Sequence, residues 1–189
     1  MSNAASPMLR KASLVRGRTL NLRNAEVGDA EFILALRSDA QKSRFLSGTS
    51  HELGLQQAWL EAYAHGADQA YFIIEDMAQQ RLGTVRLYDP VDTSFCWGSW
   101  IVKAGAAPVV AIESALMVYA YALNHLGFVS AHFDVRVGNE SVWQFHERFG
   151  AERIRETADD IFYTISHQRI VDSMRRYRKY MRTEIIVEY

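Results

Sequence analysis

Two kinds of hydrophobic pattern alternate along this chain and divide it into strands and helices. Strand-forming residues, which alternate with polar ones most regularly in residues 129–138, indicate strands at 19–25, 70–76, 81–89, 93–102, 129–138, 152–157 and 160–166. Apolar residues recur at helical spacing in the segments that separate these strands. We therefore expect helices at residues 28–39, 55–66, 109–127, 139–151 and 167–181.

The order of these elements indicates the fold class. The segment 93–138 forms a strand–helix–strand unit, which requires a parallel pair, whereas the hairpins on either side of it are antiparallel. We expect an α/β (α+β) fold with a mixed, mostly antiparallel sheet of six to seven strands. The central pair is parallel, and helices cover both faces.

The two ends of the chain differ in character from its middle. Residues 1–17 begin with MSNA, which looks like an expression-tag remnant, and continue as a polar and basic stretch that we expect to be disordered. Residues 18–182 contain no repeat and no linker, so we expect one domain. The tail, 183–189, reads TEIIVEY and is strand-like. It can pair with a sheet edge, of this chain or of a second subunit in a homodimer.

Composition excludes several classes of function. The chain is 49% hydrophobic with a formal net charge of -1, which fits a soluble globular domain and gives little attraction to nucleic acid. No apolar run is long enough for a membrane span. The single cysteine, Cys96, allows no disulfide within the chain, so a cytoplasmic location is expected. The six histidines show no metal-ligand spacing, so we expect no metal.

The segment WIVKAGAAPVVAIES runs from a strand through small residues into the longest helix. Small residues let a ligand approach the backbone closely, and the free N–H groups of a helix start attract anions. The segment is therefore a candidate phosphate-binding loop, although the same pattern is found in ordinary tight turns.

One strand after this helix, the chain reads Asn-x-x-Val-x-x-Phe-His-Glu-Arg-x-Gly over residues 139–150. Together with the loop and helix, this segment resembles the GNAT superfamily of acetyl-CoA-dependent N-acyltransferases. The similarity extends from about residue 19 to residue 165. It is strongest to the branch of ribosomal-protein N-terminal acetyltransferases and nucleotide-amino-sugar acetyltransferases.

The resemblance implies that acetyl-CoA is the cosubstrate and that the central parallel pair splays apart to admit it. The residues it assigns to the cofactor lie on the splayed strand, in the phosphate loop and on the following short helix: Trp100, Ile101, Val102, Lys103, Ala104, Gly105, Ala106, Ala107, Val109, Val110, Ala111, Asn139 and Phe145. The loop departs from the family pattern, because Ala106 replaces an arginine or glutamine and Val109 replaces a glycine. Cys96 stands where related members often carry a glutamate.

His146 takes the position at which the family usually has a tyrosine, which protonates the leaving thiolate. A histidine with an ordinary pKa near 6.5 is able to do this near neutral pH. The helical pattern places His146 at the edge of a buried face. The alternative is a half-buried histidine that is hydrogen-bonded to a backbone carbonyl.

The acceptor amine must lose a proton, and His132 with Asp134 on one face of a strand is a candidate base with its orienting carboxylate. A structural salt bridge from Asp134 to Arg136 or to a helix is the alternative that we favour. Residues that we expect to border the acceptor pocket come from a polar loop and the hairpin strands: Arg44, Glu75, Arg86 and Tyr88. Arginines there suit a phosphate-bearing acceptor, because guanidinium groups match phosphate oxygens.

These observations predict an acetyl-CoA-dependent N-acetyltransferase that acts on the primary amine of a small molecule, with a nucleotide-linked amino sugar as the leading acceptor. A protein N-terminal acetyltransferase is the alternative enzyme. A non-catalytic protein that binds coenzyme A or a protein partner is the alternative of a different class.

Overall fold

The computed structural model describes residues 6–38 and 52–189, and these form a mixed α/β structure around one sheet. The sheet has nine strands in the order β7-β8-β6-β5-β4-β3-β2-β1-β9. Their bounds, in that order, are Glu152–Glu156, Asp160–Ile165, Ser130–Arg136, Ser94–Val102, Arg81–Val91, Ala70–Asp76, Leu20–Asn24, Leu14–Arg16 and Ile186–Glu188. All neighbouring strands are antiparallel except β5 and β6, which are parallel. The expected fold class is confirmed.

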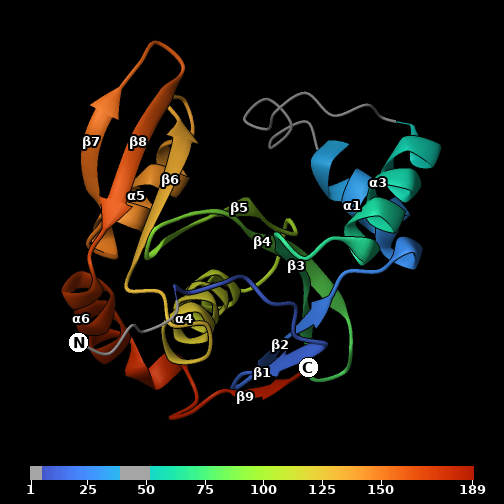
Figure 1. Cartoon of the computed structure of the whole chain (residues 1–189), viewed down its shortest axis with the longest axis horizontal. Coiled ribbons are helices and arrows are strands. Elements are labelled where there is room, and N and C mark those ends of the chain that lie inside the picture. Colours follow the sequence, from blue (N-terminus) through green and yellow to red (C-terminus); the bar gives the residue numbers. More distant parts are fainter. Residues whose placement is uncertain (1–5, 39–51) are drawn as a thin grey trace.

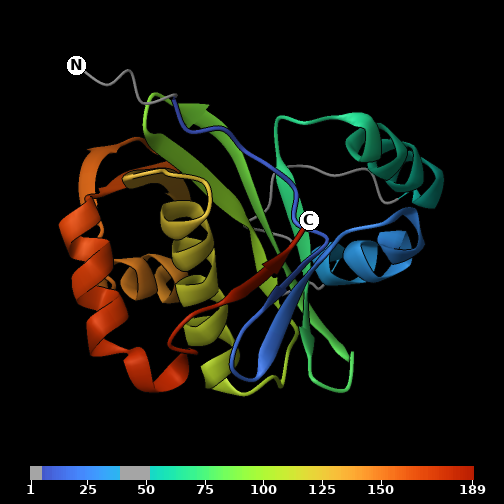
Figure 2. The ribbon, with the colours of Figure 1, turned by 60° about the horizontal axis from the view of Figure 1, so that its bottom comes forward.

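Helices cover both faces of the sheet, as Figure 2 shows. One face carries the 3-10 turn η1 (Val27–Asp29) and the helices α1 (Ala30–Ser38) and α3 (Leu53–His65). The opposite face carries α4 (Pro108–Asn124), α5 (Glu140–Arg148), α6 (His167–Arg176) and the 3-10 turn η2 (Arg178–Tyr180). Each face has its own hydrophobic cluster, so the sheet is the middle layer of three.

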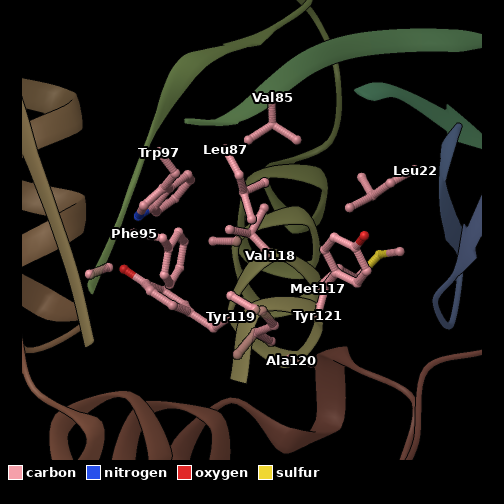
Figure 3. Close-up of a cluster of buried hydrophobic side chains, with 14 of the residues drawn as sticks. Leu22, Val85, Leu87, Phe95, Trp97, Met117, Val118, Tyr119, Ala120 and Tyr121 are labelled. Atoms are coloured by element: carbon pink, nitrogen blue, oxygen red, sulfur yellow. The ribbon is translucent and has the colours of Figure 1, made fainter. Parts of the chain in front are cut away.

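The main core forms around α4, which is apolar on nearly all sides. Residues 113–122 of this helix are all buried. Figure 3 shows side chains of α4, among them Val118 and Tyr119, packed against Leu87, Phe95 and Trp97 of the sheet. Each large apolar side chain buried in this way contributes roughly 1.5–3 kcal/mol, so α4 is the main element that holds the sheet in place.

A buried carboxylate fixes the N-terminal half of α4 to the sheet. Glu113 is fully buried, and its Oε1 accepts hydrogen bonds from the backbone N–H groups of Arg18 and Thr19, both at 2.7 Å. The Thr19 hydroxyl donates to the other oxygen. A buried carboxylate needs such partners, because an unpaired charge in the core is costly. The turn between β1 and β2 is thereby held against α4.

The parallel pair separates partway along its length. β5 and β6 are paired only at Ser94–Ser130, Phe95–Ala131 and Cys96–His132. Beyond these pairs β5 remains paired with β4, and β6 remains paired with β8. The sheet therefore opens into two halves (Figure 1). The pairing of β5 with β6 therefore ends at Cys96.

The structure corrects two expectations, about where the fold begins and about the number of strands. The fold begins before residue 18, because Leu9, Ala12 and Val15 are buried and β1 pairs with β2. The tail forms β9, which pairs with β1 of the same chain. These two short strands raise the sheet from the expected six or seven strands to nine.

Candidate active site

A cleft of about 200 Å³ lies where β5 and β6 separate. Its lining residues come from α1, β4, β5, β6 and α5: Arg37, Arg86, Tyr88, Trp97, Gly98, Ser99, Trp100, Phe133, Asp134, Val135, Arg136, Asn139, Val142 and His146. Six of the residues singled out from the sequence are among them: Arg86, Tyr88, Trp100, Asp134, Asn139 and His146.

A β-bulge shapes the β5 wall of the cleft. The register between β4 and β5 shifts between Thr84 and Arg86, and Ser99 has a left-handed backbone with φ 45°. The Thr84 hydroxyl donates a 2.8 Å hydrogen bond to the Ser99 carbonyl oxygen, which holds the bulge. Bulges re-aim the chain next to functional sites. The sequence pattern gave no sign of this bulge, since serine in a strand is unremarkable.

His146 lies in an aromatic enclosure at the α5 wall. Only 5% of the residue is exposed. Its ring centroid lies 4.2 Å from that of Phe133, 5.1 Å from Trp97 and 5.7 Å from Trp100. His146 is therefore buried more deeply than the expected edge position or the half-buried alternative, and it is the one residue of α5 that is buried.

This enclosure changes the chemistry available to His146. Burial lowers the pKa of His146 to about 3, so the imidazole is neutral near pH 7. Its Nδ1 atom is buried and has no hydrogen-bond partner within the described residues. The expected carbonyl-bonded histidine is therefore not found at Nδ1. A neutral imidazole is able to donate one hydrogen bond and accept another.

Tyr88, Cys96 and Gly98 form the adjoining part of the β4–β5 wall. Tyr88 is opposite Cys96 in the register, so its phenol ring lies on the same strand face as the thiol. Burial raises the pKa of Cys96 to about 11, so the thiol stays protonated. A Cβ atom on Gly98 would lie 2.8 Å from the Tyr88 hydroxyl oxygen. The glycine therefore leaves the space that the phenol ring occupies.

The expected interactions of the β6 face are not found. His132 is absent from the cleft lining, and its Nδ1 lies 2.8 Å from the Ser94 hydroxyl instead of pairing with Asp134. The favoured Asp134–Arg136 salt bridge is not found either, because Arg136 pairs with Asp160 at 3.3 Å. Asp134 stays at the cleft rim. Partial burial, with the nearby charge of Asp160, raises the pKa of Asp134.

Glu75 was expected at the acceptor pocket, but the structure places it elsewhere. It is buried and paired with Arg23 at 2.8 Å, in a separate polar cavity. The register explains the difference, because Glu75 is opposite Arg81 while Arg86 is opposite Tyr71, at the other end of β3. Arg44 lies outside the described residues. Arg37 lines the cleft and was missed, because an arginine in a last helical turn usually signals only a solvated helix end.

The candidate phosphate loop connects β5 to α4. Gly105 has φ +79°, which glycine adopts without strain, and Ala106 N–H closes the turn onto the Lys103 carbonyl at 3.2 Å. Within residues 6–38 and 52–189, the N–H groups of Ala104, Gly105 and Ala107 donate to no backbone carbonyl.

No side chain caps α4, and its first turn begins with Pro108. The loop therefore offers free N–H donors at a helix start, which suits a pyrophosphate. Val110 is buried in the core, whereas Val109 is partly exposed at the helix start. Phe145 packs on Trp100, with ring centroids 4.9 Å apart, and so closes the cleft on the α5 side. The separation of β5 from β6 and this loop together fit an extended, phosphate-bearing cofactor such as acetyl-CoA.

Two further searches cover the described part of the chain. No group of three or more histidine, cysteine, aspartate or glutamate side chains within it is arranged to hold a metal ion. No helix within it has the length and apolar character needed to cross a bilayer.

The comparisons with known proteins agree with this geometry. The profile of the acetyltransferase (GNAT) domain matches residues 19–152. Apo FdhC, a nucleotide-linked sugar GNAT, is 33% identical over 93% of this chain and 99% of its own, with a TM-score of 0.77. No curated protein sequence matched.

Two more distant structures share the fold. A GCN5-related N-acetyltransferase from Brucella melitensis is 16% identical over 95% of this chain and 90% of its own, with a TM-score of 0.78. Spermidine N-acetyltransferase from Vibrio cholerae, solved with CoA and spermine, is 17% identical over 81% of this chain and 98% of its own, with a TM-score of 0.73. From the domain match and the FdhC identity, this chain belongs to the GNAT acetyltransferase family.

Proposed function

We propose that this protein transfers the acetyl group of acetyl-CoA to the primary amine of a small molecule, with a nucleotide-linked amino sugar as the leading acceptor. The observation that carries the proposal is the separation of β5 from β6 after Cys96, which leaves a strand edge and a cleft side by side. The 33% identity to a nucleotide-linked sugar GNAT over nearly the whole chain supports the choice of acceptor.

The cofactor side of the proposal uses β5, the loop and α5. The backbone of Trp100, Ile101, Val102 and Lys103, which lies beyond the β5–β6 pairing, would pair with the pantetheine arm as an added strand does. The N–H groups of residues 104–107 and the start of α4 would hold the pyrophosphate. Asn139, at the N-cap of α5, and Phe145 would border the arm. Bound acetyl-CoA supplies an acetyl group that is activated as a thioester.

The acceptor would enter from the opposite side of the cleft. Arg86, Tyr88 and Gly98 lie on one strand face with Asp134 across the opening. This wall is cationic and aromatic at one end and carries a carboxylate at the other. Such a distribution suits a ligand with a negatively charged body and a basic amine.

Two side chains would handle protons. Asp134 would accept the proton of the amine, because partial burial and the charge of Asp160 raise its pKa and make it a stronger base than an ordinary aspartate. His146, held neutral by burial, would donate a hydrogen bond to the departing sulfur. Most of the acceleration would come from holding the amine and the thioester in line.

Release of free thiol from acetyl-CoA, measured with a matched acceptor panel, tests the proposal. The panel pairs a nucleotide-linked amino sugar with the same amino sugar without the nucleotide, and adds spermidine and a peptide with a free N-terminus. We expect kcat/KM to be at least about a hundredfold higher for the nucleotide-linked sugar than for the free sugar.

Each other result has a distinct meaning. Equal rates on the free and nucleotide-linked sugars would remove the support for a nucleotide-linked acceptor. Preference for the peptide would favour a protein N-terminal acetyltransferase. Calorimetric binding of coenzyme A without thiol release on any amine would favour a non-catalytic CoA-binding protein.

A further inference from the structure

Two arginines from different elements line the same cleft. Arg37 comes from the last turn of α1, and Arg86 comes from the middle of β4. Both line the same cleft of about 200 Å³. Burial lowers the pKa of Arg37, and the positive charge of Arg86 acts in the same direction. The two guanidinium groups are therefore close enough to repel each other across a partly desolvated space.

The Arg86 guanidinium is held in place by neutral groups. Its Nη1 atom donates to the Gln69 side-chain oxygen at 3.3 Å. Its central carbon lies 4.3 Å from the centroid of the Tyr88 ring and 5.7 Å from that of Trp59. Stacking on aromatic rings fixes the plane of a guanidinium without neutralising its charge.

This guanidinium also retains an unused donor. The Nε atom of Arg86 is buried and has no hydrogen-bond partner within the described residues. Buried donors are nearly always paired in native proteins, so an orphaned one on a cleft wall indicates a missing partner. The donor points to a ligand that carries hydrogen-bond acceptors.

The charges around the cleft do not compensate Arg86. Within residues 6–38 and 52–189, Arg86 forms no salt bridge. The third arginine of the cleft, Arg136, is already paired with Asp160 at 3.3 Å. The β4 wall of the cleft thus carries positive charge that no described carboxylate neutralises.

We propose that Arg37 and Arg86 form a two-guanidinium site that binds the diphosphate of the acceptor. Each guanidinium fork matches the oxygens of one phosphate, and two forks on adjacent walls match two linked phosphates better than one. A bound dianion removes the repulsion between the arginines and supplies the acceptor for Arg86 Nε. This inference rests on the proposed function, and it adds that the nucleoside diphosphate is recognised independently of the sugar.

The test is calorimetric titration of the full chain with UDP and dTDP, and with UMP and dTMP as the matched monophosphates. Coenzyme A also contains a diphosphate, so each titration is repeated with saturating coenzyme A. The variants are Arg37→Gln and Arg86→Gln. Arg175→Gln on α6 removes the same charge away from the cleft and is the control. Thermal unfolding of each variant verifies that it is folded.

We expect one of the nucleoside diphosphates to bind the parent, with coenzyme A present, at least about tenfold more tightly than its monophosphate. Each cleft variant should raise the Kd for that diphosphate at least about tenfold, and Arg175→Gln should change it less than about twofold. The inference is overturned if neither diphosphate binds the parent, if the cleft variants bind as the parent does, or if coenzyme A abolishes binding.

The readouts separate this inference from the proposed function. If diphosphate binding depends on Arg37 and Arg86 but no amino sugar is acetylated, the site stands and the proposed function fails. If a nucleotide-linked amino sugar is acetylated with the same KM by the parent and both variants, the proposed function stands and the site fails.

Discussion

The ring of His146 packs against the ring of Phe133, with centroids 4.2 Å apart and an interplanar angle of 39°. Trp97 and Phe145 complete the enclosure, at 5.1 Å and 5.8 Å from the imidazole. The contact joins α5 to β6 at the point where β6 leaves β5. It therefore sets both the shape of the cleft and the ionisation of its histidine.

The burial of His146 predicts a specific pH dependence of stability. The pKa of His146 is about 3 in the folded protein and near 6.5 when unfolded, so between these values the unfolded chain binds the extra proton. The stability contribution is complete above the unfolded pKa and falls as pH decreases toward the folded one. When the pH is lowered from about 7.5 to about 5, we expect the free energy of unfolding of the parent to fall by about 2 kcal/mol more than that of His146→Phe.

Urea denaturation at both pH values measures this difference. Phenylalanine is the matched replacement, because it preserves an aromatic ring among Phe133, Trp97 and Phe145 but does not titrate. Other titrating groups are common to both proteins and cancel in the comparison. Parallel pH dependences would show that His146 is solvated or paired in solution.

Activity should depend on the hydrogen-bonding capacity of His146 and not on its protonation. We expect His146→Phe to lower kcat at least about tenfold, because the sulfur loses a donor, while the KM for acetyl-CoA changes little. His146→Tyr, which restores the hydroxyl usual in the family, should recover part of kcat. If kcat of His146→Phe stayed within about twofold of the parent value, His146 would have a packing role only.

Asp134 should govern the acid limb of the pH–rate profile. Its pKa is raised by partial burial and by the charge of Asp160, and Asp160 also occupies Arg136. Asp160→Asn removes the repulsion and releases Arg136, and both effects lower the Asp134 pKa. The acid limb of kcat/KM should therefore move to lower pH, whereas Asp134→Asn should lower kcat/KM about a hundredfold or more.

The matched control for this profile is Asp159→Asn. It removes the same charge one residue away, and Asp159 contributes only a backbone carbonyl, to Val137 N–H at 2.9 Å. An acid limb that stays in place in Asp160→Asn would assign the base to a group other than Asp134.

The middle of the fold was predictable because its elements are long and locally periodic. The alternation in residues 129–138 predicted β6, and the helical pattern in residues 109–127 predicted α4. The edges were predictable only in part. The strand-like tail was expected and forms Ile186–Glu188, but Leu14–Arg16 was missed, because so short a strand shows no period and pairs across the whole chain.

The candidate site was predictable where a local pattern fixes it. The helical wheel placed His146 close to the buried face of its helix, although the structure buries it more deeply than an edge position. Arg86 and Tyr88, expected at the acceptor pocket, line the cleft. The prediction that Glu75 borders the acceptor pocket was wrong, because its position depends on the register between two strands, which no single strand reveals. Arg37 was missed for a similar reason, because only the packing of α1 on the sheet brings it to the cleft.

Gly98 and Tyr88 should be energetically coupled. In Gly98→Ala the added Cβ would lie 2.8 Å from the Tyr88 hydroxyl oxygen and 3.4 Å from its Cε1 atom. We expect this change to cost about 1–3 kcal/mol of unfolding free energy, because the phenol ring must shift in a packed wall. Tyr88→Phe removes the closer contact, so the same glycine substitution should cost about 1 kcal/mol less in that background. Urea denaturation of the four proteins measures the coupling.

Gly54→Ala is the matched control for this cycle. A Cβ at Gly54 meets no atom within 4 Å, so alanine in the first turn of α3 should be neutral or slightly stabilising. Additive costs at Gly98 and Tyr88 would mean that the phenol moves aside without strain. The β4–β5 wall of the cleft would then be adjustable instead of fixed by the packing of Tyr88 against Gly98.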